Sequence, residues 1–227
     1  LQPSSLFVAI RGANRDTHND LELARQAGAV VAVVEHTVAA PDGLAIILVR
    51  STRRALAGLA AAWYGHPDRD LRIVAVTGTK GKTTVTSMLA QIMQAAGIET
   101  ATMGTRGAIY DDTIHDLPNT TPAPLLLYSH MRGMVDAGVD TLVMEVSSQA
   151  VRQERTTGLR FWRSLFLNIS EGDHISPTEH KDFAEYLSCK AEILQQSDLA
   201  WINGDDPHLA ALDRKSTRLN SSHITIS

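Results

Sequence analysis

Short apolar runs alternate with amphipathic stretches along most of the chain, and the first third holds three such runs. Each run is rich in β-branched or aliphatic residues, which predicts a buried strand. The three strands are expected at residues 6–10, 29–35 and 45–49. A helix between the first two should end at Gly28, and Ser51 should cap the helix that follows the third. We expect Trp63, on the apolar stripe of that second helix, to lie in the core.

The same alternation resumes after residue 70. Strands are expected at residues 71–76, 141–146, 161–169 and 199–203, and helices after residue 81, from about residue 122 and from Asp182. The first of these helices has an apolar stripe of Val85, Met88, Leu89, Ile92, Met93 and Ala96, and it should end at Gly97. Strands that alternate with helices predict an α/β fold with a mostly parallel sheet covered by helices. In such a sheet, ligands bind at the carboxyl ends of the strands.

Composition and charge narrow the class of protein. Of the 227 residues, 44% are hydrophobic and 20% are charged, which is typical of a globular chain. The net charge of −4 gives no reason to expect nucleic acid or an anionic membrane as a partner. The single cysteine, Cys189, excludes an internal disulfide framework and suits a reducing compartment. No apolar run in the sequence is long enough to span a bilayer, so we expect a cytoplasmic protein.

The polar stretch HPDRD at residues 66–70 predicts a linker between two domains. We expect a small N-terminal α/β domain over residues 1–66 and a larger α/β domain over residues 67–213. Both ends look unnatural, since the chain starts at Leu1 without a methionine, so the start of the first domain is expected to be missing. Residues 214–227 resemble translated cloning or sequencing adaptor, and we exclude this tail from the predicted fold.

The stretch VTGTKGKTT, Val76 to Thr84, has most of a phosphate-binding loop but valine where a P-loop has its first glycine. Phosphate binding needs backbone N–H groups around one point, a helix N-terminus, a lysine for the charge and a hydroxyl for the metal. Gly78 and Gly81 supply the turn, Lys82 the charge and Thr83 the hydroxyl, between a strand and a helix. The pattern favours a nucleotide site over a strand–helix turn that is glycine-rich by chance.

Three further motifs follow the loop: NTTPAP at 119–124, MEVSSQAVRQER at 144–155 and FLNISEGDHISPTEHKDFAEYLSCK at 166–190. Together with the shortened loop TGTxGKTT, they resemble the Mur ligase family, which also includes folylpolyglutamate synthetases. The resemblance covers residues 5–213 and is strongest to the branch that adds the third residue of the peptidoglycan stem peptide. It implies an N-terminal domain that binds a UDP-linked substrate and a P-loop-type central domain, here incomplete. It also implies a C-terminal ligase domain that this chain lacks, so we expect the chain as it stands to be inactive.

The resemblance implies an ATP-dependent amide ligase that forms an acyl phosphate and then lets an amine displace the phosphate. In such a reaction, positioned cations stabilise the charge on the transferring phosphoryl group. The implied ATP-binding residues are Gly78, Thr79, Lys80, Gly81, Lys82, Thr83 and Thr84. The implied magnesium ligands are Thr83, Glu145 and His174, and the implied catalytic residues are Lys82, Glu145, His174 and Lys190. Lys80 stands where many relatives have asparagine, and its side chain has no assigned role.

Two of these residues also have simpler interpretations. Glu145 ends the apolar strand 141–146, where an acid can be either a metal ligand or a solvated residue. Magnesium prefers oxygen ligands, so His174 by itself would suggest zinc or a core position. The magnesium assignment of His174 therefore comes from the resemblance alone.

Lys190 offers an argument that is independent of the resemblance. Asp182 and Glu185 form a candidate capping box at the start of its helix. The apolar residues Phe183, Tyr186, Leu187, Ile193 and Leu194 lie three, four or seven positions from Lys190. The lysine therefore lies on the buried face, where desolvation lowers the pKa of an amine and leaves it able to react. In the family, the matching lysine is carbamylated by carbon dioxide and supports the magnesium.

For the UDP-MurNAc-dipeptide substrate, the resemblance implies polar contacts from residues in two of the motifs. They are Asn119, Thr120, Thr121, Ser147, Gln153 and Arg155, each of which could equally cap a helix or stabilise a turn. The implied ligands are thus ATP, Mg²⁺, carbon dioxide, the UDP-MurNAc-dipeptide and an amino acid, bound by a monomer. The alternatives are another Mur ligase, a folylpolyglutamate synthetase, or a generic P-loop kinase or GTPase. A generic P-loop protein would have no need of Lys190.

Overall fold

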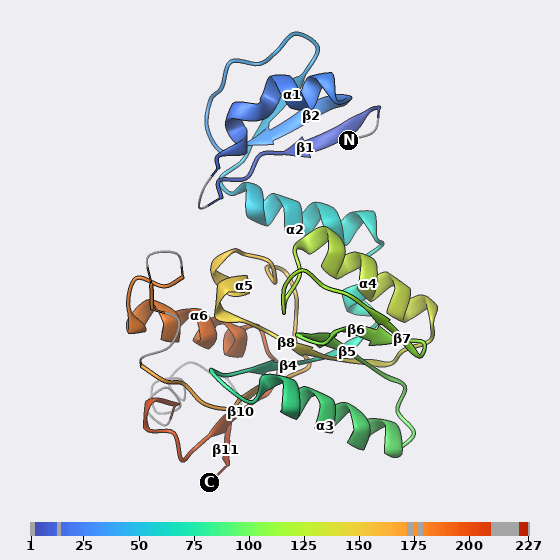
Figure 1. Cartoon of the computed structure of the whole chain (residues 1–227), viewed down its shortest axis with the longest axis vertical. Coiled ribbons are helices and arrows are strands. Elements are labelled where there is room, and N and C mark those ends of the chain that lie inside the picture. The colour runs from blue at the N-terminus through green and yellow to red at the C-terminus, as the bar shows by residue number, and fades with distance from the viewer. Residues whose placement is uncertain (1–2, 13–14, 172–174, 177–178, 210–222, 227) are drawn as a thin grey trace. The chain divides into compact units, whose positions relative to one another are not determined.

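The computed structural model describes residues 3–12, 15–171, 175–176, 179–209 and 223–226, and Figure 1 shows its elements. The chain divides into two compact units, Leu1–Leu59 and Ala60–Ser227. Both units are α/β, which confirms the predicted fold class. The functional domain bounds 1–66 and 67–213 stay predictions. Within the described residues, none of the helices has the length and hydropathy needed to cross a membrane.

The first unit is built on a parallel sheet in the order β1-β2-β3. Its elements are β1 (Ser5–Val8), the 3-10 helix η1 (Thr17–Asp20), α1 (Leu21–Gln26), β2 (Ala29–Val34), β3 (Ala45–Leu48) and the first part of α2 (Thr52–Trp63). Gly28 follows α1 with a φ of 104°, so the predicted stop is confirmed. Ser51 Oγ accepts from the Arg54 N–H at 3.2 Å, which confirms the predicted cap of α2.

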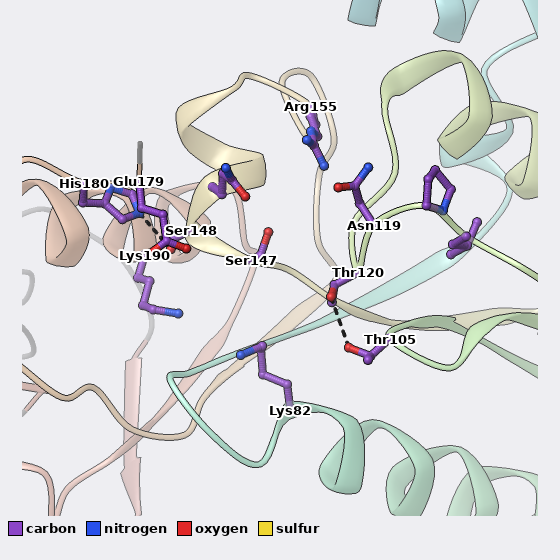
Figure 2. Close-up of a pocket in the computed structure, with 13 residues that line it drawn as sticks. Lys82, Thr105, Asn119, Thr120, Ser147, Ser148, Arg155, Glu179, His180 and Lys190 are labelled. Carbon is purple, nitrogen blue, oxygen red and sulfur yellow. Dashed lines mark hydrogen bonds between the residues drawn. The ribbon is translucent and has the colours of Figure 1, made fainter. Parts of the chain in front are cut away.

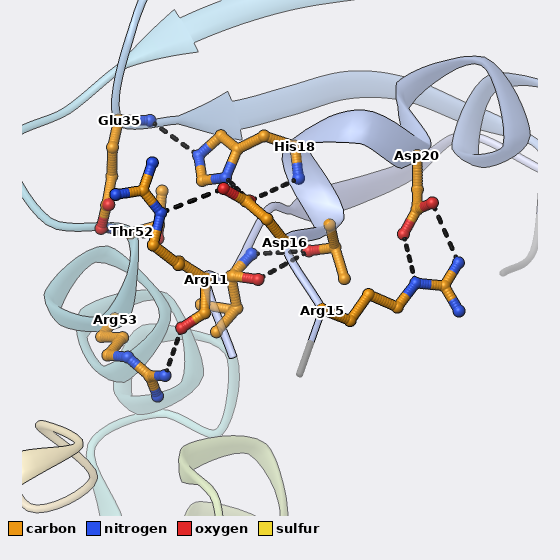
Figure 3. Close-up of polar contacts among 10 residues, drawn as sticks. Arg11, Arg15, Asp16, His18, Asp20, Glu35, Thr52 and Arg53 are labelled. Atoms are coloured by element: carbon orange, nitrogen blue, oxygen red, sulfur yellow. Dashed lines mark hydrogen bonds and ion pairs between the residues drawn. The ribbon is translucent and has the colours of Figure 1, made fainter. Parts of the chain in front are cut away.

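A buried histidine joins three segments of this unit (Figure 3). His18 Nε2 accepts the Glu35 N–H at 3.1 Å, so the ring proton lies on Nδ1 and is donated to Asp16 Oδ1 at 2.6 Å. The His18 backbone N–H and ring both donate to Asp16 and hold the pKa of that carboxyl well below its usual range. The Glu35 carboxylate accepts from Thr52 N and Oγ1 at the start of α2. Both ring nitrogens of His18 form hydrogen bonds within the protein, so this cluster has a structural role: it joins the segment before η1, the end of β2 and the start of α2.

The second unit is built on one mixed sheet, in the order β11-β10-β9-β4-β8-β5-β6-β7 over the described residues. Pairing is parallel from β11 to β5 and antiparallel from β5 to β7. The strands are β4 (Arg72–Thr77), β5 (Thr100–Gly104), β6 (Gly107–Tyr110), β7 (Thr113–His115), β8 (Thr141–Glu145), β9 (Arg163–Phe166), β10 (Ala200–Asn203) and β11 (His223–Ile226). The helices are η2 (Pro67–Arg69), α3 (Lys82–Ala95), α4 (Pro124–Asp136), α5 (Ser148–Arg152) and α6 (Phe183–Gln195).

Helices cover both faces of this sheet (Figure 1). Alternate residues of β4 point to opposite faces, so Ile73 and Ala75 pack with α4 while Val74 and Val76 pack with α3. Phe166 of β9 packs with α6 on the α4 side of the sheet. The three central parallel strands β4, β8 and β9 therefore end at one edge, between α3 and α6. That edge holds the loop Val76–Thr84.

On two helices, α2 and α3, residues that were predicted to lie in the core are exposed, so these predictions are wrong. Trp63 is 81% exposed, because α2 buries the small side chains of Ala57, Ala60 and Ala61, a stripe rotated by about one residue. On α3, Val85, Leu89 and Met93 pack on the sheet, whereas Met88 and Ile92 are 57% and 63% exposed. A helix that is rich in alanine, or apolar around much of its surface, has two stripes that could be buried. Which of them is buried depends on the element against which the helix packs.

Two further differences concern elements that the pattern did not predict. The antiparallel hairpin of β6 and β7, next to β5, lies between residues 100 and 115, for which no strand was expected. The tail was left out of the predicted fold, yet its residues His223–Ile226 pair in parallel with β10 as β11. This pairing adds β11 to the sheet beyond β10. The foreign origin of residues 214–227 is a separate prediction and stays one.

Candidate active site

The loop after β4 turns sharply into α3. Gly78 and Gly81 have φ values of 155° and 83°, a region that side chains rarely adopt. A Cβ on Gly78 would also lie 3.1 Å from Leu167 Cβ, so this glycine lets the loop pass close to the segment after β9. The first helical bond of α3 runs from Val85 N to Gly81 O, which leaves the preceding N–H groups free of helical partners. Such N–H groups at a helix start can bind an anion, and phosphate binding at this loop stays a prediction.

The segment after β9 braces this loop. Asn168 clasps the peptide of Lys80 from both sides: its Oδ1 accepts from Lys80 N at 3.0 Å and its Nδ2 donates to Lys80 O at 3.1 Å. Thr79 N donates to Asn168 O, and Thr79 Oγ1 accepts from Ser170 N and bonds Tyr186 Oη at 2.9 Å. Thr79 and Lys80 were predicted as ATP-binding residues. Their N–H groups and the Thr79 hydroxyl form hydrogen bonds within the protein, so both residues fix the shape of the loop, and their contact with ATP stays a prediction.

Lys82 and Lys190 reach the same carbonyl oxygen of the loop. Lys82 Nζ donates to Gly78 O at 2.8 Å and to Thr79 O at 3.0 Å. Lys190 Nζ donates to Gly78 O at 2.9 Å and to Thr77 Oγ1 at 3.3 Å. Figure 2 shows both amines pointing into one space between α3 and α6. Two cationic groups this close repel each other unless one gives up its proton.

The burial of Lys190 that the apolar stripe predicted is confirmed, since the side chain is 1% exposed. Burial, and next the charge of Lys82, lower the pKa of Lys190 from 10.5 to about 7. Burial also lowers the pKa of Lys82, and the Glu145 carboxylate opposes that shift. Asp182 caps α6 by accepting from Glu185 N at 2.8 Å, as predicted, while Glu185 reaches back to Lys181 N. Near neutral pH, Lys190 is therefore the amine that can lose its proton.

Glu145 ends β8 beside the loop and is 2% exposed, which excludes the solvated-acid interpretation. Its Oε2 accepts from Thr83 Oγ1 at 3.1 Å and from Thr105 Oγ1 at 3.2 Å, and its Oε1 accepts from Thr105 N at 2.9 Å. In the part of the chain that the structure describes, no lysine or arginine forms an ion pair with this carboxylate. A buried carboxylate held by neutral donors, next to a threonine hydroxyl, suits a hard cation such as Mg²⁺.

A cavity of about 430 Å³ opens in front of these groups (Figure 2). Lys82 and Lys190 line it, together with four of the predicted substrate residues: Asn119, Thr120, Ser147 and Arg155. Thr105, Ser148, Glu179 and His180 also line it, and the sequence did not assign them a role. The structure thus brings the loop lysine, the α6 lysine and the polar motifs to one hollow.

The other two predicted substrate residues, Thr121 and Gln153, do not line the cavity. Thr121 is fully buried: its hydroxyl donates to Glu145 O at 2.9 Å and accepts from Ser147 N at 3.1 Å. Gln153 Oε1 accepts from Arg155 Nη2 at 2.7 Å, and Arg155 Nη1 donates to Thr121 O at 2.6 Å. Thr121 and Gln153 therefore hold Glu145, Ser147 and Arg155 in place.

His174, predicted as a magnesium ligand, lies outside the described residues. Of the residues that sequence reasoning missed, Asn168 and His180 stand inside a quoted motif. Asn168 follows β9, so a polar side chain after a strand was its available signal, whereas His180 precedes α6 and had only its place in the motif. His180 Nε2 lies 2.9 Å from Ser148 Oγ, both buried. Thr105 follows the unpredicted β5 and had no signal. In the described residues, no group of three His, Cys, Asp or Glu side chains is placed to hold a metal.

Comparison with known proteins places this site in a family. Residues 76–227 match the model of the Mur ligase middle domain. The chain is 38% identical over 221 residues to the UDP-N-acetylmuramoyl-L-alanyl-D-glutamate–2,6-diaminopimelate ligase of Geobacter metallireducens, covering 93% of this chain and 43% of the relative. It is 42% identical over 184 residues to the UDP-N-acetylmuramyl-tripeptide synthetase of Latilactobacillus sakei, covering 79% and 36%. The chain thus spans less than half the length of these curated relatives.

Solved structures show the same fold. A structure of a UDP-N-acetylmuramoyl-L-alanyl-D-glutamate–2,6-diaminopimelate ligase superposes with a TM-score of 0.83 at 23% identity, over 99% of this chain and 46% of the other. The MurF ligase of Thermotoga maritima, solved in complex with ADP, superposes with a TM-score of 0.60 at 20% identity, over 99% and 48%. The order of elements around the loop is therefore that of a known ligase fold.

The contact between Gly104 and Glu145 generates a first prediction. A Cβ at Gly104 would lie 2.2 Å from Glu145 Oε1, so Gly104→Ala must displace the buried carboxylate. We expect a loss of about 1–3 kcal/mol in the free energy of unfolding, measured in urea. The matched control is Gly58→Ala on α2, where a Cβ meets nothing within 4 Å and should leave stability equal or slightly raised. Equal stability of the two variants would contradict the contact.

The lowered pKa of Lys190 generates a second prediction. Between pH 7 and 10 the unfolded chain keeps the Lys190 proton and the folded chain loses it, so stability rises with pH. This rise approaches about 1.4 kcal/mol per pH unit and should vanish in Lys190→Met. Urea unfolding in CO₂-free buffer measures it, with Lys181→Met at an exposed lysine as control. Parallel pH curves for the wild type and Lys190→Met would show that the amine keeps an ordinary pKa.

Proposed function

The chain belongs to the Mur ligase family, and from this premise we propose that it takes part in ATP-dependent amide ligation in peptidoglycan synthesis. The substrate would be UDP-N-acetylmuramoyl-L-Ala-D-Glu, and the reaction would add the third amino acid of the stem peptide. One observation carries the proposal: the loop lysine Lys82 and the α6 lysine Lys190 line the same cavity as Asn119, Ser147 and Arg155. A generic P-loop protein needs a loop lysine such as Lys82, but it has no need of Lys190 or of the polar residues Asn119, Ser147 and Arg155.

The proposed reaction has two steps that balance in atoms and charge. The γ-phosphoryl group of ATP passes to the substrate carboxylate, which gives an acyl phosphate and ADP. The neutral amine of the incoming amino acid then attacks the carbonyl carbon, a C–N bond forms as the C–O bond to phosphate breaks, and the proton that the nitrogen loses leaves with the phosphate or to solvent. Lys82 and the N–H groups that begin α3 would hold the phosphate charge in both steps, because fixed donors stabilise a charge without reorganising. In this proposal, Asn168 and Thr79 keep the loop between β4 and α3 in the shape that binds phosphate.

The residues around Glu145 fit a magnesium ion. Glu145 Oε2 and Thr83 Oγ1 are two oxygen donors 3.1 Å apart at the start of α3, and the carboxylate has no cationic partner among the described residues. Mg²⁺ is usually held by one or two protein oxygens plus phosphate oxygens and water. A bound Mg²⁺ would supply charge neutralisation for the phosphate groups. His174, as a further ligand, stays a prediction.

Lys190 would act after carbamylation in this proposal. The neutral amine attacks the carbon of CO₂, a C–N bond forms, and the released proton goes to solvent. The product is a carboxylate in place of an ammonium. Repulsion between Lys190 and Lys82, which share Gly78 O, would become attraction. The low pKa of the buried amine, about 7, supports this step because it provides the neutral form near neutral pH.

The substrate side of the cavity suits an anionic, hydroxyl-rich ligand. Arg155, with Asn119, Thr120 and Ser147, offers a guanidinium, an amide and hydroxyls on one wall. Of the two relatives above, one is named for 2,6-diaminopimelate and the other's name specifies no amino acid, so the proposal covers an amino acid as a class. ATP and a nucleotide sugar are metabolites of the cytoplasm, where we place the reaction, with the protein acting as a monomer.

Ligand binding tests the proposal directly. Calorimetric titration of the purified chain should detect UDP-MurNAc-L-Ala-D-Glu and MgATP. Lys82→Ala should weaken MgATP binding about 10- to 100-fold, since it removes a charge-assisted hydrogen bond to phosphate. Lys181→Ala, at an exposed lysine of the described chain, is the control and should bind as the wild type does. Binding of a tetrahydrofolate in place of the UDP substrate would point to the folylpolyglutamate branch and reject the proposal.

A further inference from the structure

Thr105 lies directly after β5, at the carboxyl end of a strand next to β8, and it contacts both Glu145 and Thr120. Its N–H donates to Glu145 Oε1 at 2.9 Å, which fixes the residue against the carboxylate. Its hydroxyl lies 3.2 Å from Glu145 Oε2 and 3.1 Å from Thr120 Oγ1. Thr105 and Thr120 both line the cavity, as Figure 2 shows. One hydroxyl thus joins the candidate metal carboxylate to the candidate substrate wall.

The direction of these hydrogen bonds follows from proton counting. An ionised carboxylate can only accept hydrogen bonds, so the single hydroxyl proton of Thr105 must be donated to Glu145 Oε2. Thr105 Oγ1 can then only accept from Thr120, which makes the Thr120 hydroxyl the donor in that contact. The relay runs from Thr120 to Thr105 to Glu145. In this arrangement Thr120 presents lone pairs to the cavity and repels the oxygens of an anionic ligand.

A cation at Glu145 would reverse this relay. If Oε2 gives its lone pairs to a cation, the acceptor for the Thr105 proton is lost, and Thr105 can donate to Thr120 instead. Thr120 would then turn its own proton toward the cavity and donate to an anionic oxygen. Thr83 also donates to Oε2, but its hydroxyl has no contact with Thr120 that could carry the change. Thr121 bonds the Glu145 backbone carbonyl and leaves the carboxylate alone.

We propose that Thr105 is a positioning residue that couples cation occupancy at Glu145 to substrate binding at Thr120. The inference rests on the proposed function for the identity of the substrate. The Thr105–Thr120 contact itself does not depend on it, because it is a hydrogen bond between two residues of the chain. The coupling needs the hydroxyl of Thr105 and not its backbone N–H. A side chain of equal shape without the hydroxyl therefore isolates it.

Three variants and a control separate coupling from packing. Thr105→Val keeps the shape and the N–H contact to Glu145 Oε1 but removes the hydroxyl, while Thr105→Ser restores it. Thr120→Val breaks the same relay from its other end, should Thr105→Val fail to fold. Thr113→Val is the matched control, because it removes an exposed threonine hydroxyl on the neighbouring β7 that bonds Asp111 O. Circular dichroism verifies that each variant is folded.

The first measurement is the affinity for UDP-MurNAc-L-Ala-D-Glu with and without MgADP. The wild type, Thr105→Ser and Thr113→Val should bind the substrate roughly tenfold more tightly with MgADP, within the usual range of coupling between two sites. Thr105→Val should lose that tightening. A variant that merely packs badly would weaken binding equally in both conditions. The same tightening in Thr105→Val as in the wild type would overturn the proposal.

The second measurement tests the relay without the substrate. It is needed if the wild type does not bind UDP-MurNAc-L-Ala-D-Glu, a result that would count against the proposed function and not against the relay. A double-mutant cycle of Thr105→Val and Thr120→Val, by urea unfolding, should give a coupling of about fivefold in the unfolding equilibrium constant. This coupling should change when MgADP is added. A cycle with no coupling, or one that MgADP leaves unchanged, refutes the relay.

Discussion

The Gly78 carbonyl oxygen accepts hydrogen bonds from two amines, that of Lys82 on α3 and that of Lys190 on α6. The rest of the site depends on this contact, because it ties both helices to the turn after β4. Two ammonium groups on one buried oxygen are electrostatically unfavourable, and the conflict is relieved if Lys190 is neutral. The position of Lys190 is thus both a structural tie and the source of its low pKa.

Parallel pairing then decides what surrounds the two lysines. Strands β4, β8 and β9 run in one direction, so the phosphate loop, Glu145 and the Asn168 brace all follow their carboxyl ends. Strand β5 adds Gly104 and Thr105 from the next position, and the missing side chain of Gly104 makes room for Glu145. Charged groups that are distant in the sequence meet at one edge, with their backbone partners supplied by the neighbouring strand.

Sequence reasoning found the parts of this site that depend on local pattern. The loop between a strand and a helix, the acid at the end of β8 and the buried stripe of Lys190 each follow from spacing alone. Thr105 could not be found in this way, because it is exposed and its contacts with Glu145 and Thr120 join segments that are separate in the sequence. The hairpin of β6 and β7 was missed as well, because its short strands are only partly buried. Likewise Trp63 was placed in the core, since an alanine-rich helix has two usable faces and the sequence does not say which is covered. The hydrogen bonds between Asn168 and the backbone of Lys80 join residues that are far apart in the chain, so no local sequence pattern predicts them.

The central claim is that Lys190 is an amine made reactive by burial beside a second lysine. Addition of ¹³C-labelled bicarbonate at neutral pH, followed by ¹³C NMR, tests this most directly. The account predicts one slowly exchanging carbamate resonance in the wild type that disappears in Lys190→Ala and weakens as the pH falls below about 7, where the amine is protonated. A wild-type spectrum that matches Lys190→Ala at saturating bicarbonate would contradict it.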